Sequence, residues 1–488
     1  MAEDTVEIQA LAAEDELVAK LDNNEGLALK AVNTGDMNSK TYVRFCCCNI
    51  EERKYVLGLF TLINIFLFAD QNLLAPNLTV ISEEFNMTED ERDIYLGGYI
   101  SIGFFAVGGV VAVAVGYLAD SVNRKWTFAA VVVAGELSCM ATYWVPANSI
   151  DDFWRGLWLT RTLTGIALGG AVPIQFSIFG DFFTPKERGR AVAGLTIAVG
   201  VGQGAGQFMA GYLSPDWRTP FLLVSIPAFL LVALYCATTE EPPRGAAEVL
   251  TDEHGNKVEV NDTITLEKFK KLISRPSVLM IFAQGIFGIL PWGIALVFLN
   301  DFLIEEKELT STQAANVLLT WGLALAASAI FAGWIADKLH DEGKRKLPLI
   351  AGITTILAPF PTLFVIRGPN TSAFVYAAVL VPAGFIAGIA GVIMKTLLFG
   401  VTIPETRGSA YSLLSLVDEI GKGVGPYLAS LIIVGLGNRT DGITVAVLMW
   451  IPCGFIHLMM YFTIERDGKA AQLEMLQYHT QNKEEESL

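Results

Sequence analysis

One long apolar run of this sequence ends in Gly116-Tyr-Leu-Ala-Asp120-Ser-Val-Asn-Arg124-Lys125, and a second ends in Gly333-Trp-Ile-Ala-Asp337. The second phrase starts 217 residues after the first (333 − 116), and Lys344, Arg345 and Lys346 follow it after a short insertion. Another phrase, Pro185-Lys-Glu-Arg188-Gly189, returns as Pro404-Glu-Thr-Arg407-Gly408 after 219 residues (404 − 185). Two phrases repeated in one order at nearly one spacing indicate that the chain consists of two related halves.

The composition is that of a membrane protein. Of the 488 residues, 52% are hydrophobic and 17% charged, and the mean hydropathy is +0.47. The 45 glycines agree with this, because membrane helices carry more glycine than soluble ones. Much of the net charge of −16 lies in the tails, since residues 1–39 hold nine acidic and two basic side chains. This acidic balance argues against nucleic acid as a partner.

No motif for enzymatic chemistry is present. The sequence lacks a phosphate-binding loop, a metal-ligand cluster and a nucleophile constellation, so we expect no enzyme activity, no cofactor and no metal. The six cysteines show no paired spacing. Cys46-Cys47-Cys48 stands before the first apolar run, where palmitoylation and an unmodified cluster are both open readings. The first 40 residues are polar and acidic, so we expect the first apolar run to act as the insertion signal.

The apolar runs divide into about twelve membrane spans, since a helix needs roughly 20 apolar residues to cross the hydrocarbon. They cover residues 55–78, 96–118, 126–146, 156–180, 190–213, 219–237, 277–300, 312–335, 347–366, 373–399, 409–434 and 443–463. We therefore predict an all-α polytopic membrane protein with twelve transmembrane helices in two pseudo-symmetric six-helix bundles. Its predicted parts are an acidic tail (1–54), a first bundle (55–237), a central loop (238–276), a second bundle (277–463) and a C-terminal tail (464–488).

Basic residues are concentrated in the loops on one side of the predicted bundle. This side carries both repeated phrases together with Arg44, Arg53 and Lys54, whereas the opposite loops hold about one basic residue each. The asymmetry predicts that both tails lie in the cytosol. Four Asn-x-Ser/Thr sequons, at Asn77, Asn86, Asn370 and Asn438, then fall on or near the far side.

The doubled Gly-x-x-x-Asp…Arg-Lys phrase resembles the signature loop of the major facilitator superfamily, which follows helix 2 and recurs after helix 8. The Pro-x-x-Arg-Gly phrases resemble the loops after helices 4 and 10 of that superfamily. The resemblance covers residues 55–463 and implies two helical halves that rock about a central cavity. It also implies that the glycines of helix 5, among them Gly200, Gly202, Gly204 and Gly206, lie at the interface between the halves.

The repeated phrases predict two cytosolic latches. We expect Asp120 to meet the positive N-terminus of the helix that starts near Ser409, and Arg124 with Lys125 to hold carboxylates or lipid phosphates. Asp337 with Arg345 and Lys346 would act in the same way toward the helix near Ala191. The alternative is that these residues only set the topology by their positive charge. The gating candidates are Gly116, Asp120, Arg124, Lys125, Arg188, Gly333, Asp337, Arg345, Arg407, Asp418 and Lys422.

Ionisable residues inside membrane spans are costly, so each is a candidate for function. Asp70 in helix 1 and Arg161 in helix 4 are the leading pair, as a substrate clamp or a proton switch. Asp418 and Lys422 are four residues apart on one helix and are predicted to pair with each other. The substrate or proton-coupling candidates are Asp70, Gln71, Glu136, Arg161, Gln175 and Lys395. Interruptions at Pro76 and at Pro291-Trp292-Gly293 are expected to border the binding site.

Within the superfamily, the first half is most similar to the spinster family. The similarity rests on Asp70, on the phrase from Gly116 to Lys125, and on Arg161-Thr-Leu-Thr-Gly165 running to Ile178-Phe-Gly-Asp181. It implies export of lysophospholipids or sphingoid phosphates, in some members with proton coupling. This chain has Gln71 and Leu168 where the family has an arginine and a glutamate of its proton switch.

The sequence therefore predicts a secondary active or facilitative transporter that moves a small organic or amphipathic solute, of which a lysolipid-like molecule is one candidate, by alternating access. Protons are a possible coupling ion, membrane lipids are expected around the chain, and a monomer is the expected functional unit. The plasma membrane and an endolysosomal membrane are the expected locations. Two alternatives are a sugar or organic-anion carrier of another branch, and a non-transporting membrane receptor or scaffold on the same fold.

Overall fold

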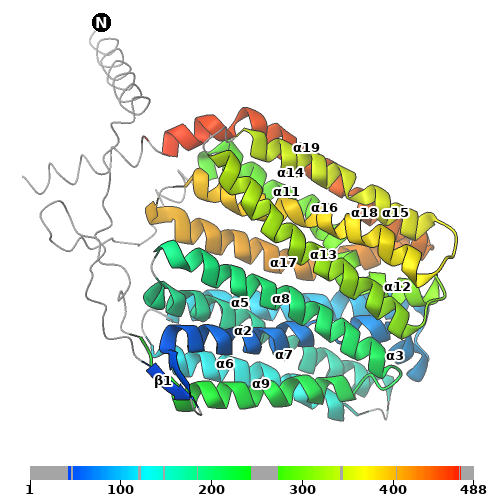
Figure 1. Cartoon of the computed structure of the whole chain (residues 1–488). Helices are drawn as coiled ribbons and strands as arrows, with labels where there is room; N and C mark the ends of the chain where they lie inside the picture. Colours follow the sequence, from blue (N-terminus) through cyan, green and yellow to red (C-terminus); the bar gives the residue numbers. More distant parts are fainter. Residues whose placement is uncertain are drawn as a thin grey trace, which may run out of the picture.

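The computed structural model describes residues 42–45, 48–118, 122–146, 149–183, 185–242, 273–340, 345–402, 404–471 and 473. Nearly all of these residues lie in long helices that run side by side (Figure 1). One hairpin precedes them, with β1 (Tyr42–Phe45) antiparallel to β2 (Cys48–Glu51), in the segment that the sequence assigned to the N-terminal tail without predicting any element there. Cys46, Cys47 and the acidic tail of residues 1–39 lie outside the described residues.

The first six predicted spans correspond to helices from residue 52 to residue 238. They are α2 (Glu52–Asp70) with η1 (Ala75–Asn77) and α3 (Leu78–Glu84); α4 (Glu89–Glu91), η2 (Arg92–Tyr99) and α5 (Ile100–Leu118); α6 (Arg124–Ala141) with η3 (Thr142–Trp144); α7 (Ile150–Phe182); α8 (Pro185–Leu213); and α9 (Thr219–Thr238). We call this set the N-terminal half.

The last six spans correspond to helices from residue 276 to residue 462. They are α11 (Pro276–Gly293), η4 (Ile294–Phe298) and α12 (Leu299–Glu305); α13 (Ser311–His340); α14 (Lys346–Leu357) with α15 (Pro359–Arg367); α16 (Ala373–Gly400); α17 (Pro404–Leu436); and α18 (Arg439–Leu448), α19 (Trp450–Met459) and η5 (Met460–Phe462). We call this set the C-terminal half. The exact domain boundaries stay a prediction, because residues 243–272 between the halves lie outside the described part.

Eleven helical stretches among the described residues are long and apolar enough to cross a membrane. The remaining predicted span is α8, a helix of 29 residues that is rich in glycine and carries charged residues in its first turns. The architecture of twelve long helices therefore confirms the predicted fold class.

The first and seventh spans both depart from a regular α-helix near Pro76 and Pro291. Helix α2 ends at Asp70, and four residues of turn and bend separate it from the short 3₁₀ helix η1. Helix α11 carries Pro291 inside it and gives way at Ile294 to the π-helix η4. A proline has no N–H to donate and so disturbs the helical hydrogen bonds around it. The first span is therefore broken, whereas the seventh stays helical from Pro276 to Glu305 and changes only its winding.

Each half packs mainly on itself, and the two halves meet along two helix pairs. In Figure 1, α2, α6, α7 and α9 lie in the lower part of the view, and α11, α14, α16 and α19 lie in the upper part. The halves contact each other where α8 lies against α13 and where α5 lies against α17. These two seams hold the two bundles together.

The glycines of α8 serve two different contacts. A Cβ added at Gly202 would lie 2.5 Å from the carbonyl oxygen of Ile65, and one at Gly206 would lie 2.1 Å from that of Ala69. Both carbonyls belong to α2, so this pair packs α8 within its own half. Gly204 and Gly211 instead face α13 of the other half, near Leu319 and Ala315. The expected role at the interface therefore holds for only some of these glycines.

Candidate functional site

Asp70 and Arg161 form a buried ion pair in the centre of the N-terminal half. The Nη1 atom of Arg161 lies 2.8 Å from Oδ1 of Asp70, and its Nη2 donates to the backbone carbonyl of Asp70 at 3.1 Å. Asp70 is the last residue of α2, where the helix breaks. The guanidinium also lies over the rings of Phe104 and Phe221, 5.6 and 5.0 Å from their centroids. The helix break thus presents both a carboxylate and a carbonyl to one arginine.

Arg161 also lines a cavity between the halves. The polar lining includes Arg161, Gln71 and Asn72 from the N-terminal half and Lys422 from the C-terminal half. The rest of the wall is largely apolar and comes from η1, α3, η2, α5 and η4, with Phe104 and Phe105 among its side chains. Both irregular spans, the first and the seventh, contribute to the lining, as expected from the sequence. The cavity therefore joins two cationic side chains to an apolar wall.

Glu136 of α6 lies close to this pair, inside the N-terminal half. Its side chain is fully buried, and neither carboxylate oxygen has a hydrogen-bond partner among the described residues. Oδ2 of Asp70 and Nε of Arg161 also lack partners there. The charges of Asp70 and Arg161 both act on Glu136. The three groups thus form one electrostatic cluster.

Two other predicted site residues lie apart from the cavity. Gln175 forms a reciprocal amide pair with Asn64, at 2.9 and 3.1 Å, and both side chains are buried. This pair satisfies the amides of α2 and α7 against each other, so Gln175 is not part of the cavity lining. Lys395 has an exposed side chain on α16 and is not in the lining either.

Lys422 forms its ion pair with Glu419, three residues before it, rather than with the predicted partner Asp418. Positions three and four residues apart both neighbour a side chain on a helix, so the sequence alone did not distinguish the two acids. Asp418, the residue before Glu419, has an exposed side chain and makes no contact pair with Lys422, but the charge of Lys422 acts on it as predicted.

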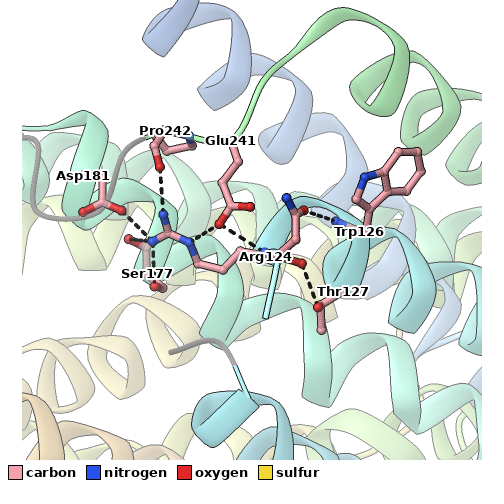
Figure 2. A network of polar contacts seen from close by, with 8 residues as sticks. Arg124, Trp126, Thr127, Ser177, Asp181, Glu241 and Pro242 are labelled. Atoms are coloured by element: carbon pink, nitrogen blue, oxygen red, sulfur yellow. Dashed lines mark hydrogen bonds and ion pairs between the residues drawn. The ribbon is translucent and has the colours of Figure 1, made fainter. Parts of the chain in front are cut away.

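Arg124 joins the ends of three helices of the N-terminal half. Its Nη1 lies 2.5 Å from Oδ2 of Asp181 on α7, and its Nε lies 2.9 Å from Oε1 of Glu241 after α9 (Figure 2). The guanidinium also donates to Ser177 and to the carbonyl of Pro242. Lys125 donates to the carbonyl of Thr239 at 2.7 Å. Arg124 holds carboxylates, as expected, but every one of these partners belongs to its own half.

The second copy of the phrase makes a similar contact in the C-terminal half. Nη2 of Arg345 lies 2.5 Å from Oε2 of Glu465, which follows η5. In both halves, the arginine near the start of the third helix thus pairs with a glutamate just after the sixth. The Arg345 pair is exposed, with 49% of the arginine side chain accessible, whereas the Arg124 side chain is 3% accessible.

Several gating candidates cannot be placed. Asp120 lies outside the described residues, and the side chains of Arg188, Asp337 and Arg407 are not described. A Cβ added at Gly116 or Gly333 would meet nothing within 4 Å. A latch across the halves at these residues therefore stays a prediction.

A buried ionic network connects the two halves at the opposite end of the bundle, where α3 and α12 lie on the right in Figure 1. Thr79 of α3 donates to Asp301 of α12 from its backbone N–H and from its hydroxyl, each at 3.1 Å. Arg439 of α18 lies 2.7 Å from Oδ2 of Asp301 and 3.4 Å from Oδ1 of Asp93. Arg92 donates to Asp93 at 3.0 Å and to Thr79 at 3.1 Å.

We call the set of Thr79, Arg92, Asp93, Asp301 and Arg439 the outer network. All five of its side chains are buried. Two arginines balance two aspartates, and the contacts cross from one half to the other. Sequence reasoning treated Arg92 and Arg439 only as far-side loop residues and missed Asp301, which directly follows the predicted seventh span. Its place at the end of an apolar run was the available signal.

Comparison with known proteins gives a consistent result. The family model described as Major Facilitator Superfamily matches residues 60–397 and 282–477. Human "Protein spinster homolog 1" is 23% identical over 398 residues, which cover 77% of this chain and 72% of that protein. The zebrafish (Danio rerio) "Sphingosine-1-phosphate transporter SPNS2" is 23% identical over 400 residues, covering 77% and 75%.

A solved structure with this fold is that of a bacterial homologue of the human lysosomal transporter spinster, in an inward-facing and unoccupied conformation. It superposes with a TM-score of 0.68 at 18% sequence identity, and the match covers 85% of this chain and 98% of the other.

Proposed function

The chain belongs to the Major Facilitator Superfamily, and from that premise we propose that it carries a lysolipid-like amphipathic solute with an anionic head by alternating access. The observation that carries the proposal is the cavity between the halves. Arg161 and Lys422 offer it positive charge, while the aromatic and aliphatic side chains of the rest of its lining suit an acyl or alkyl chain. The name of the SPNS2 relative, a sphingosine-1-phosphate transporter, agrees with such a solute.

Both cavity cations already have carboxylate partners, Asp70 and Glu419. An anionic head would therefore compete with a carboxylate for its cation. This exchange gives the solute a way to loosen contacts in the site when it binds, which is the requirement for coupling a ligand to a change of conformation.

Alternating access is supported by the distribution of ionic contacts. At the end with Arg439, the buried network of Thr79, Arg92, Asp93, Asp301 and Arg439 connects the halves and closes the path. At the other end, the described contacts of Arg124 and Arg345 stay within one half. By the basic residues of its loops, the Arg124 end faces the cytosol. This conformation is therefore closed to the outside.

The orientation places both tails in the cytosol, in the plasma membrane or an endolysosomal membrane, with a monomer as the transporting unit. A pH dependence would follow from the buried carboxylates Asp70 and Glu136, which a proton could bind during the cycle.

A transport assay in proteoliposomes tests the proposal against its alternatives. Uptake of radiolabelled sphingosine 1-phosphate and lysophosphatidate is compared with that of xylose and of benzoate, a small organic anion, in vesicles with and without a pH gradient. Saturable uptake of the two lipids supports the proposal. Saturable uptake of only xylose or benzoate assigns the chain to another branch, and absence of any saturable uptake favours a receptor or scaffold.

A further inference from the structure

Glu136 occupies a closed position between three helices. The next helix is very near, since a Cβ added at Gly135 would lie 2.4 Å from the Cβ of Ala167 and 2.9 Å from the carbonyl oxygen of Thr164, both on α7. One turn further on, the thiol of Cys139 lies 3.8 Å from the carbonyl oxygen of Phe221 on α9. Glu136 is 0% exposed, so no solvent reaches its carboxylate.

The groups that face Glu136 leave one negative charge unbalanced. They are Asp70 from α2, Arg161 from α7 and Cys139 from α6 itself, while α9 contributes the uncharged Ser225. Arg161 is the single cation among them and binds Asp70 at 2.8 Å. The hydroxyl of Ser225 donates to the carbonyl of Phe221. An ionised carboxylate without a partner is very costly to bury, so the cluster is complete only with one added positive charge.

We infer that Glu136 is a proton-binding site, which holds one proton in this conformation and shares Arg161 with Asp70. The ligand is a proton rather than a metal cation because hard cations need a shell of oxygen ligands. The described apolar neighbours of Glu136 include Val132, which is buried one helical turn before it, and Ala167 of α7, which is buried beside Gly135. Only the step from binding to coupled transport rests on the proposed function.

The arrangement gives a simple exchange. When Arg161 pairs with Asp70, the proton stays on Glu136, and the three groups are neutral together. If the conformation changes so that water reaches the cluster and a proton from that water binds Asp70, Arg161 is free to pair with Glu136, whose own proton then passes to the same water. Arg161 lines the cavity and has an unpartnered Nε, so it joins the buried acid to the solute path. One proton enters and one leaves, and no charge is left alone.

Infrared difference spectroscopy tests the site without any solute. Spectra of purified protein in acidic and alkaline deuterated buffer report the carbonyl stretch of protonated carboxyl groups. Glu136→Gln should remove one such band that persists in the wild type at neutral pH, and Asp441→Asn, which alters an exposed carboxylate paired with Arg367, should leave it in place. If wild type and Glu136→Gln share the same bands, Glu136 carries no proton and the inference is wrong.

Thermal unfolding gives a second readout. Glutamine resembles the protonated acid, so Glu136→Gln should match the wild type in acidic buffer and exceed its midpoint increasingly as the pH rises, because the unfolded wild type ionises this glutamate and the unfolded variant has no proton to lose. A midpoint difference that is constant with pH would overturn the inference. If the band is assigned and no lipid is transported, the proton site stands and the proposed solute fails. If lipids are transported without a Glu136 band, the reverse holds.

Discussion

Thr79 in the N-terminal half donates two hydrogen bonds to the carboxylate of Asp301 in the C-terminal half, each 3.1 Å long. Backbone and side chain of one residue are both used, so the contact fixes the position of α3 against α12. Arg439 completes the balance of charge on Asp301 at 2.7 Å. Because the network is buried and spans both halves, opening this end requires that it separate.

Asp301→Asn should therefore favour the conformation that is open to the outside. The substitution leaves Arg439 partly uncompensated in a buried place, a change that costs about 3 kcal/mol or more for a broken buried pair. A cysteine introduced at Ser101, which lines the cavity, should react faster with a membrane-impermeant maleimide added from outside. Asp441→Asn breaks an exposed pair with Arg367 at the same end and serves as the control. Equal labelling rates in the two variants would show that the network is not a gate.

The two copies of the repeated phrase predict unequal effects on stability. Arg124→Ala removes a guanidinium that is 3% accessible together with its contacts to Asp181 and Glu241, and the expected loss is about 3 kcal/mol. Arg345→Ala removes a pair that is exposed on both sides, and the expected loss is below about 1 kcal/mol. Chemical or thermal unfolding in detergent measures both. A similar loss in both variants would contradict the role assigned to burial.

Sequence reasoning succeeded where a periodic or repeated signal exists. The doubled phrases and the apolar runs predicted the fold, Pro76 marked the broken first span, and Pro291 marked the change of winding in the seventh. It failed where a choice depends on packing. The contact pair of Lys422 is with Glu419 rather than with Asp418. These acids lie three and four residues before Lys422, and both spacings allow a contact on a helix, so the sequence did not distinguish them. Gln175 was expected in the cavity, yet a second amide, Asn64, lies opposite it on α2.

The outer network illustrates the same limit at longer range. The network joins Thr79 and Asp93 to Asp301 and Arg439, which are far from them in the sequence. Charged residues are ordinary near loops, so their positions alone did not indicate a contact. Only the approach of η2, α3, α12 and α18 shows that they form one unit.

The prediction for Asp120 rests on the sequence. Asp120→Asn should lower flux and leave folding and surface delivery largely intact, and normal flux in this variant would contradict the latch.

Glycan mapping tests the proposed orientation. Asn86 and Asn370 are exposed at the Arg439 end, whereas Asn77 is fully buried and its Nδ2 donates to the carbonyl of Ala210. In a eukaryotic host, Asn86→Gln and Asn370→Gln should each raise electrophoretic mobility by one glycan, and Asn77→Gln should not. Modification of none of these sequons, together with protease access to that end from the cytosol, would reverse the orientation.

Lys422 is expected to select for an anionic head. Lys422→Gln should raise KM for lysophosphatidate about tenfold, the effect of losing one charge-assisted hydrogen bond, and should leave a neutral monoacylglycerol unaffected. Glu419→Gln is the matched variant, since it releases Lys422 from its carboxylate and should lower the same KM. An equal rise of KM for both lipids in Lys422→Gln would assign Lys422 a structural role.

Asp70 and Glu136 are expected to substitute for each other as the partner of Arg161. Asp70→Asn frees the arginine to bind ionised Glu136, and Glu136→Gln leaves the pair with Asp70 intact, so each single variant should fold. The double variant Asp70→Asn with Glu136→Gln leaves Arg161 buried without a carboxylate, and its loss of stability should exceed the sum of the single losses by about 1–3 kcal/mol. Unfolding free energies of the wild type, the two single variants and the double variant complete this double-mutant cycle.

Each single variant should also lose the pH dependence of uptake, because one carboxylate cannot exchange a proton with a partner that is missing. Additive losses of stability, or a pH dependence that survives in Asp70→Asn, would show that the two acids act independently.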